Sequence, residues 1–543
     1  MNPLFLLTLA AAVSMLVIPL ARHLAPRLGL VDMPDDRKVH TVPIPRIGGW
    51  GITLGSLLPL LLVFRLDPLV QAFVIGSLIL FSFGVWDDAR TIGHWSKFAG
   101  QLAAAGIVVY YGDLWVARVP FLDTPLPAAV GQPFTLFALI GVINAINHSD
   151  GLDGLAGGET ILSLIALAIL GHMSGSALIL SIALATVGGI FGFLRYNSYP
   201  AYVFMGDCGS QVLGFTVGFL VVLLTQRANT ALSAALPLLV LGVPLADILS
   251  VLYQRIRGGL HWFKATRNHI HHRLIELGFD HYETVVIIYS LQVALVVSAV
   301  LARYESDLTV VLLYALIVTG LFGALALAER RRWRLYRARG TASRLTRTIT
   351  ALKASPLVPQ ISLLVIAAVT LLVMLLTALW VAPIPRDVAS AAALLAVVVA
   401  LPLLWPRLRW AALLRLAMYA TAIFPAYLMI NYPAAIPPGV QSLTATVIIV
   451  LAVAIMGYVR LSTGQRFGTT PTDYLIVCGT GALLVFGTIE ANSRTVIQAV
   501  LLAIVLMYAC EIILGSSTGN SRARWLQFST LGTLLIIAVR GVL

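Results

Sequence analysis

Long apolar stretches make up most of this 543-residue chain, and short polar clusters interrupt them at a few places. Stretches of about 20 apolar residues cross a bilayer as helices, because only helices and closed barrels satisfy the backbone in lipid. Charged residues amount to 11% of the chain, whereas soluble domains contain about 25%. The sequence therefore predicts an all-α polytopic membrane protein, with about 11 transmembrane helices before residue 330 and about 7 more after residue 359.

Basic residues alternate between the loops, and the net charge is +13. Loops that are rich in Lys and Arg mark the cytoplasmic side of a membrane protein. With eleven spans, the basic loops around residues 22–46, 90–97 and 255–273 fall on one side, together with every polar cluster. We therefore expect a multi-pass membrane protein whose functional site faces the cytoplasm.

A strongly basic segment divides the chain. Residues 329–359 contain Arg or Lys at nine positions and one acid, Glu329. This pattern favours a cytoplasmic linker on anionic lipid, and an anionic partner is the alternative. Nucleic-acid binding is disfavoured because no stacking aromatic residues or folded module accompany the charge. We expect a domain at 1–328, the linker at 329–359, and a helical membrane domain of unknown role at 360–543.

Two acidic motifs stand at the ends of apolar stretches. Asp87 and Asp88 end one stretch, and Asp207 lies between glycines before another. Adjacent carboxylates repel unless a cation lies between them, so such a pair binds Mg²⁺ or acts as a base. Two solvated loop acids, or a helix cap by Asp207 or Ser210, are the structural alternatives.

A glycine-rich motif follows another apolar stretch. Asn144, Asn147, Asp150 and Asp153 recur every third residue, and glycines at 151, 154, 157 and 158 lie among them. Glycines allow backbone N–H groups to approach a phosphate or a flat base closely. A capped turn is the structural alternative, but this many polar residues beside an apolar helix favour a binding site.

Histidine and basic residues form the remaining clusters. His269, His271, His272 and Arg273 suit phosphate oxygens better than zinc, since no thiolate is nearby. Basic residues at 37, 38, 40 and 46 precede the second apolar stretch and suit an anionic headgroup, although topology alone also explains both clusters. Asp247 lies inside an apolar stretch and needs a partner, for which Arg255 and Lys97 are the candidates. The cysteines at 208, 478 and 510 have no metal or redox spacing.

Together these motifs resemble the polyprenyl-phosphate N-acetylhexosamine-1-phosphate transferases, which start bacterial O-antigen, teichoic acid and related polymers. The resemblance covers residues 1–328 and rests on five motifs in the family's order. They are Arg37–Gly49 (RKVHTVPIPRIGG), Asp87-Asp88 with Lys97 and Gln101, Asn144–Gly154 (NAINHSDGLDG), Phe204–Ser210 (FMGDCGS) and His269–Arg273 (HIHHR).

Two details refine the resemblance. The last motif lacks the three consecutive histidines of the lipid I synthase branch, so it looks like the UDP-GlcNAc branch. His148-Ser149 replaces residues that are usually apolar or small, and the acid common before the histidines is replaced near Thr266.

The resemblance implies the reaction and the roles of the residues. N-acetylhexosamine 1-phosphate, most simply GlcNAc 1-phosphate, would pass from the UDP-sugar to undecaprenyl phosphate, and UMP would leave. Asp207, Asp87 and Asp88 would be catalytic and hold Mg²⁺, with Mn²⁺ as a substitute. The substrate-binding residues would be Lys38, His40, Arg46, Lys97, Asn147, Asp150, Asp153, Asn197, Phe204, His269, His271, His272 and Arg273.

Other functions remain as alternatives. Transfer from UDP-MurNAc-pentapeptide is one, and a transporter or lipid flippase is another. Transporters usually contain internal repeats and acids in broken helices at mid-bilayer, whereas the polar clusters here gather at one face. We expect membrane lipids but no nucleic acid as partners, and the sequence leaves a homodimer open.

Overall fold

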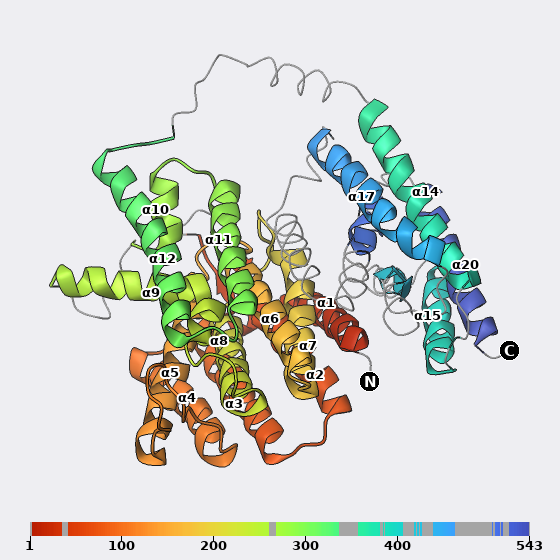
Figure 1. Ribbon diagram of the computed structural model, residues 1–543. Coiled ribbons are helices and arrows are strands. Elements are labelled where there is room, and N and C mark those ends of the chain that lie inside the picture. The colour runs from red at the N-terminus through yellow and green to blue at the C-terminus, as the bar shows by residue number, and fades with distance from the viewer. Residues whose placement is uncertain are drawn as a thin grey trace. The chain divides into compact units, whose positions relative to one another are not determined.

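The computed structural model is almost entirely helical, and it describes most of the chain (Figure 1). The described residues are 3–34, 42–259, 268–335, 357–380, 384, 386–404, 417–419, 421–422, 424–425, 438–461, 502, 505–510, 512–513 and 521–541. They fall into two compact units, one through residue 335 and one from residue 357.

The first unit contains sixteen elements in chain order, if the two short strands and the two π-helical turns are included. They are α1 (Pro3–Leu28), β1 (Val31–Asp32), β2 (Ile44–Pro45), α2 (Gly48–Val63), α3 (Pro68–Arg90), α4 (His94–Gly106), η1 (Ile107–Tyr111), α5 (Ala128–Ser149), α6 (Leu155–Met173), α7 (Ala177–Asn197), α8 (Asp207–Leu223), η2 (Leu224–Ala228), α9 (Leu236–Arg257), α10 (Ile270–Glu276), α11 (His281–Leu301) and α12 (Asp307–Arg330). The π-helical turns η1 and η2 continue α4 and α8 directly.

The prediction of a polytopic all-α membrane protein is confirmed. In the described residues, 10 helices are long and apolar enough to cross a membrane, and all but one of them precede residue 331. Helix α2, with 16 residues, and α4, with 13 residues, are not among these ten, although η1 continues α4 directly. The eleven apolar stretches expected in this half therefore all form helices.

Helix starts follow local signals in the sequence. Asp67 and Ser306 accept hydrogen bonds from the backbone N–H groups of Val70 and Thr309 at the starts of α3 and α12. Asp280 and Glu283 form a capping box at the start of α11. Such caps satisfy N–H groups that have no partner inside the helix.

Helix α8 lies at the centre of the first unit, where it packs against α2, α3, α5 and α6. The apolar stretch that α8 forms together with η2, Asp207–Ala228, is completely buried inside the protein. Gly84 of α3 allows this packing, because a Cβ there would lie 2.3 Å from Cys208 Cα. Small residues at helix contacts are the usual means of close packing in membranes. The start of α8 is consequently enclosed by its neighbours.

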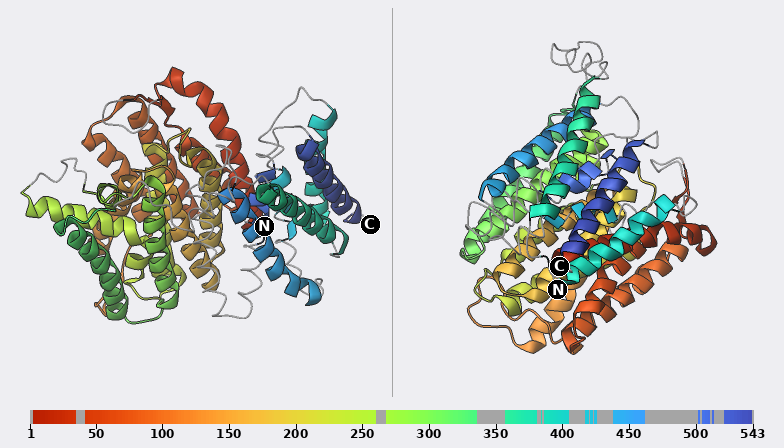
Figure 2. Two further views of the ribbon diagram at one scale, coloured as in Figure 1. Left: turned by 90° about the horizontal axis from the view of Figure 1, so that it is seen from above. Right: turned by 90° about the vertical axis from the view of Figure 1, so that its right-hand side faces the viewer.

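Helix α9 departs from the bundle. Its backbone is non-helical at Gly242, and Pro244 comes two residues later. In Figure 1 and in the left view of Figure 2, the last turns of α9 extend away from the neighbouring helices. Leu249, Tyr253 and Ile256 on these turns are exposed, as expected for side chains that face lipid.

The second unit contains α14 (Leu357–Trp380), α15 (Arg386–Leu404), α17 (Pro438–Leu461) and α20 (Ser521–Arg540) among its described residues. Helix α14 packs on α17 and α20, and α15 packs on α20. Two clusters of buried apolar residues hold these helices together. The other helices expected after residue 359 lie wholly or partly outside the described residues.

Candidate active site

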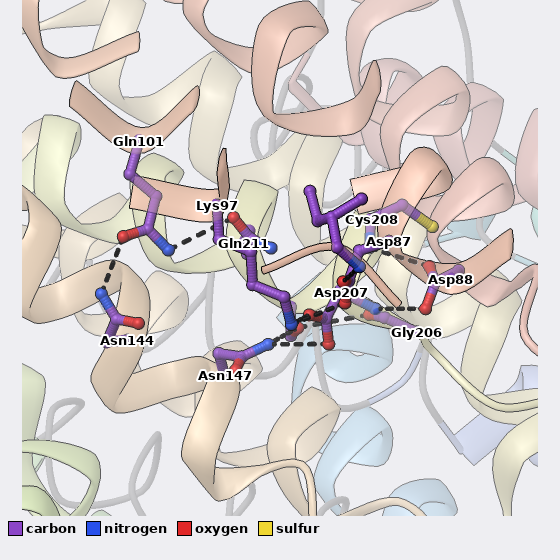
Figure 3. A network of polar contacts seen from close by, with 12 residues as sticks. Asp87, Asp88, Lys97, Gln101, Asn144, Asn147, Gly206, Asp207, Cys208 and Gln211 are labelled. Carbon is purple, nitrogen blue, oxygen red and sulfur yellow. Dashed lines mark hydrogen bonds and ion pairs between the residues drawn. The ribbon is translucent and has the colours of Figure 1, made fainter. Parts of the chain in front are cut away.

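Acidic residues from two helices meet at the start of α8 (Figure 3). Asp87 and Asp88 lie in the last turn of α3, and Asp207 is the first residue of α8. Lys97 of α4 lies between them, with Nζ 2.6 Å from Asp87 Oδ2 and 2.6 Å from Asp207 Oδ2. An ammonium shared by two carboxylates offsets their mutual repulsion. We call Asp87, Asp88, Lys97 and Asp207 the carboxylate centre.

Asp88 has a different environment from Asp87. Its Oδ1 accepts a hydrogen bond from the Asp207 backbone N–H at 3.0 Å, and its Oδ2 accepts one from the Cys208 N–H at 3.1 Å. Gly206 has φ +73°, and a Cβ there would lie 2.5 Å from Asp88 Oδ2. Asp88 thus binds two of the N–H groups at the start of α8 that have no acceptor inside the helix. Gly206 leaves room for the Asp88 carboxylate because it has no side chain. This geometry makes Asp88 the residue that fixes Asp207 in place.

Amide side chains extend the centre along α4, α5 and α8. Asn147 Nδ2 donates to Asp207 Oδ1 at 3.2 Å and to Ser210 Oγ at 2.7 Å. Asn144, one turn earlier on α5, donates to Gln101 Oε1 at 2.9 Å. Gln101 in turn donates to Gln211 Oε1 at 3.3 Å. Asn144 and Asn147 therefore face the same side of α5, as their spacing predicts.

The glycine-rich motif forms a turn that is bound from several sides. Asn197 Oδ1 accepts a hydrogen bond from Gly154 N at 2.8 Å, and Asn197 Nδ2 donates to Val203 O. Asp153 Oδ2 accepts one from Ala201 N at 3.0 Å. In the ligand-free protein, Asn197 and Asp153 thus join this turn to the segment before α8.

Asp150 lies at the end of α5 in the same turn. Burial, and then the charges of Asp207, Asp153 and Asp88, raise the pKa of the Asp150 carboxyl to about 7. Burial and like charges both disfavour the ionised form of an acid. This turn therefore carries less negative charge near neutral pH than its sequence suggests.

The histidine motif is anchored on α9 by Asp247. Asp247 Oδ2 lies 2.7 Å from His269 Nδ1, and Asp247 Oδ1 accepts a hydrogen bond from the Ile270 N–H at 2.8 Å. The expectation that Lys97 pairs with Asp247 is wrong, because Lys97 binds the carboxylate centre. Arg255, the other candidate, lies on the same helix and is not among the described partners of Asp247. A carboxylate bound to one imidazole nitrogen fixes the orientation of that ring.

The imidazole rings line up beside the glycine-rich turn. His148 stacks on His269 with centroids 5.4 Å apart, and His269 stacks on His271 at 5.8 Å. A Cβ at Gly151 would lie 2.3 Å from His271 Nε2. The glycine-rich and histidine motifs thus form one continuous surface. Burial, and then the charge of His272, lower the pKa of His271 to about 3, so this ring is neutral at physiological pH.

The remaining expected site residues lie around this surface. The guanidinium of Arg273 binds Glu329 of α12 through Nε at 2.7 Å and Nη2 at 3.0 Å. Arg46 forms an ion pair with Asp32 and a backbone bridge to Phe204. This bridge joins the loop before α2 to the loop before α8. Lys38 and His40 lie outside the described residues.

Sequence reasoning missed two polar residues near the site. Gln211 lies one turn after Asp207 and receives the hydrogen bond from Gln101. Glu159 of α6 is only 2% exposed, and its Oε2 has no hydrogen-bond partner. An acid inside an apolar stretch is itself a signal of function, so the sequence contained the clue to Glu159.

The donor set of the carboxylate centre suits a magnesium ion. Asp87 Oδ2 and Asp207 Oδ2 converge on a single cationic group, and Mg²⁺ prefers oxygen ligands, often one or two carboxylates with substrate phosphates and water. Among the described residues, no group of three or more His, Cys, Asp or Glu side chains is arranged to hold a metal. Asp87 and Asp207 are therefore the residues of this centre that could hold such an ion.

Comparisons with known proteins identify a family model and several relatives that this chain resembles. The model of glycosyl transferase family 4 matches residues 70–225, from α3 to η2. A probable undecaprenyl-phosphate N-acetylglucosaminyl 1-phosphate transferase of Bacillus subtilis is 32% identical over 292 residues, which are 53% of this chain and 82% of that protein. A decaprenyl-phosphate N-acetylglucosaminephosphotransferase of Mycobacterium tuberculosis is 31% identical over 346 residues, 57% of this chain and 85% of that protein.

A third relative is the undecaprenyl-phosphate alpha-N-acetylglucosaminyl 1-phosphate transferase of Escherichia coli K12. It is 30% identical over 294 residues, which are 52% of this chain and 80% of that protein. These matches span most of each relative but little more than half of this chain.

Proposed function

Because this chain belongs to glycosyl transferase family 4 and is a membrane-bound glycosyl-1-phosphate transferase, we propose that it transfers N-acetylglucosamine 1-phosphate from UDP-GlcNAc to a polyprenyl phosphate. UMP is the second product. The lipid-linked sugar would start a cell-envelope polysaccharide. The names of the relatives support the lipid and the sugar, and the donor nucleotide is our inference.

One observation carries the proposal. Asp87 and Asp207 come from helices far apart in the sequence, and both bring an oxygen within 2.6 Å of the same Lys97 nitrogen. Phosphoryl transfer depends mainly on positioning and on stabilising negative charge. A cation between two carboxylates at the end of apolar helices provides a place where a lipid phosphate and a diphosphate can meet.

The reaction forms one bond and breaks one. An oxygen of the lipid phosphate attacks the β-phosphorus of UDP-GlcNAc, and the bond from that phosphorus to the bridging oxygen breaks. UMP leaves with the bridging oxygen. Asp87 is suited to orient the lipid phosphate and to accept its proton, because Oδ1 is fixed by the Ile92 N–H at 2.7 Å and Oδ2 faces Lys97.

The other residues of the carboxylate centre would bind the metal ion and the phosphates, or position the residues that do. Asp207, with Asp87, would hold Mg²⁺, which supplies charge stabilisation for the diphosphate. The Lys97 ammonium is placed to bind a phosphate oxygen once it is released from the carboxylates. Asp88 is a positioning residue, since both of its oxygens bind the backbone of α8.

The histidine motif would also bind the diphosphate. His269 is oriented by Asp247, and His271 lies against Gly151 of the glycine-rich turn. A neutral imidazole such as that of His271 can donate a hydrogen bond to a phosphate oxygen without a buried positive charge. Because basic loops accompany every motif, we assign this site to the cytoplasmic side of the membrane.

The direct test is release of UMP by the purified protein in detergent with Mg²⁺, undecaprenyl phosphate and UDP-GlcNAc. Parallel reactions contain UDP-GalNAc, contain UDP-MurNAc-pentapeptide, or lack the lipid. We expect UMP only when the lipid is present, and the fastest release with UDP-GlcNAc.

A matched variant separates this activity from contamination. Asp207→Asn should abolish release, because it removes a charge from the centre. Asp113→Asn should retain release, because Asp113 is exposed and binds Arg227 remote from the centre. Folded parent protein that releases no UMP with any of the three donors would refute the proposal.

A further inference from the structure

Helix α9 is broken at Gly242, and the break leaves backbone groups without partners inside the helix. Gly242 has φ +49° and ψ −121°. Pro244 has no N–H, so the carbonyl of Val240, four residues earlier, loses its usual donor. Inside a membrane protein such groups must find other partners, because water is absent.

A single side chain occupies the break. Gln292 of α11 is completely buried. Its Oε1 accepts a hydrogen bond from the Val243 N–H at 2.8 Å, and its Nε2 donates to the Val240 carbonyl at 3.3 Å. A Cβ at Gly242 would lie 2.2 Å from Gln292 Oε1. Gln292 therefore replaces the helical hydrogen bonds on both sides of the break, and Gly242 makes room for it.

Two further side chains complete the arrangement. Ser163 of α6 accepts from Gln292 Nε2 at 2.9 Å and donates to the Val240 carbonyl at 2.9 Å. Tyr314 of α12 donates to the Gly242 carbonyl at 3.3 Å. We call Gln292, Ser163 and Tyr314 the break network. Three helices thus fix the angle at which α9 changes direction.

The direction of α9 after the break sets the position of a carboxylate. Asp247 lies five residues after Gly242, on the redirected part of α9, and is 3% exposed. It binds both the His269 ring and the Ile270 N–H. A change in the direction of α9 would move this carboxylate and, with it, the start of the histidine motif.

We infer that Gln292 is a positioning residue for the transferase reaction, which acts by fixing the break in α9 and thereby the Asp247–His269 pair. The inference rests on the proposed function for its kinetic consequences only. The geometric consequence, a fixed direction of the outer part of α9, does not depend on any activity.

The test compares two glutamines that bind backbone groups in the same way. Gln292→Met keeps the side-chain size and removes the hydrogen bonds of Gln292 to Val243, Val240 and Ser163, while the bonds from Ser163 and Tyr314 to the break remain. Gln226→Met is the matched control, since Gln226 Oε1 accepts from the N–H groups of Ala117 and Arg118 at 3.0 and 2.9 Å, remote from the histidine motif. We expect Gln292→Met to raise the KM for UDP-GlcNAc and to lower kcat much less, so that the fold-increase in KM is roughly ten times the fold-decrease in kcat. Gln226→Met should leave the KM unchanged.

A distance measurement tests the geometry directly. Spin labels at Tyr253→Cys on outer α9 and Leu312→Cys on α12 both occupy exposed positions. Protein that lacks the introduced cysteines gives the background. The distance distribution should be narrow in the parent and in Gln226→Met, and broad or shifted in Gln292→Met.

The outcomes are distinct. A folded Gln292→Met with the parent's KM and distance distribution would overturn the inference, as would an equal KM rise in Gln226→Met. If Gln292→Met does not fold, Tyr314→Phe is the second variant, because it removes one hydrogen bond to the break. It should raise the KM and broaden the distance distribution by a smaller amount. A Tyr314→Phe variant with the parent's KM and distance distribution would also overturn the inference. A parent without activity would refute the proposed function, and the distance measurement would still decide the inference.

Discussion

The two units of this protein use buried polar side chains in different ways. In the first unit they reach across helices to other side chains, as Gln101 does to Gln211 and Gln292 does to Ser163. In the described part of the second unit no acid, amide or histidine is buried, and the half-buried Arg540 of α20 binds only a backbone carbonyl of α14, that of Ala378. Thr421 and Thr530 bind carbonyls of their own helices. Because hydrogen bonds between side chains of different helices specify a unique arrangement of polar groups, we expect the chemistry in the first unit.

The largest expected effect is at Asp207. Replacing it by Asn removes one of the two carboxylates that share the Lys97 ammonium, and we expect UMP release to fall more than roughly 100-fold. Initial-rate assays at saturating lipid would measure this, with circular dichroism as the folding check. Activity close to that of the parent would mean that the carboxylate centre is not the site of reaction.

Asp88→Ala should have the next largest effect. It leaves the N–H groups of Asp207 and Cys208 without their acceptors, so we expect a loss of activity of about 10- to 100-fold and a lower Tm. The matched variant is Asp67→Ala, which removes the cap of α3. It should cost about 1 kcal/mol of stability and leave the rate per folded molecule unchanged. Equal rate losses in both variants would contradict a specific role of Asp88.

Asp150 should produce a pH effect on stability in the ligand-free, Mg²⁺-free protein. Its pKa is about 7 in the folded state, against an ordinary value of 3.8. Between these values the folded state holds a proton that the unfolded state has lost. The contribution of Asp150 to stability therefore decreases as pH rises through this window.

Asp150→Asn should flatten that part of the profile, since it removes the ionisable group. Measurements of Tm from pH 4 to pH 7, on parent and variant, would check this. An unchanged slope would show that Asp150 is already ionised across the window.

Removal of the second unit should change catalysis only a few-fold. The cut belongs after Leu335, because Glu329 binds Arg273 and the Leu335 N–H donates to the Leu277 carbonyl at 2.8 Å. A cut after residue 328 would remove both contacts. UMP release by the folded truncation measures the effect, and complete loss would show that the second unit supplies part of the site.

The smallest effect is expected inside the second unit. Thr530 is fully buried and donates to the Leu526 carbonyl of its own helix at 2.7 Å. Thr530→Val removes this bond and nothing that crosses between helices, so Tm and activity should stay close to the parent, with a stability change under about 1 kcal/mol. A large loss of activity would contradict the contrast between the two units.

The sequence by itself determined the class of fold and pointed to the polar motifs that make up the candidate site. Stretches of apolar residues are local patterns, and they predict membrane helices because lipid cannot satisfy an open backbone. The polar motifs were visible because acids and imidazoles are costly beside lipid. The same cue was present at Glu159, an acid at the start of an apolar helix, and was overlooked there.

The tertiary structure alone decided which polar groups are partners. Lys97 and Asp207 are 110 positions apart, and Asp247 and His269 are separated by the outer part of α9 and the residues after it. Adjacent Asp87 and Asp88 look equivalent in sequence, yet one faces Lys97 and the other binds the start of α8. No local pattern encodes these pairings, because they depend on how closely glycines such as Gly84 and Gly242 let separate helices and side chains approach.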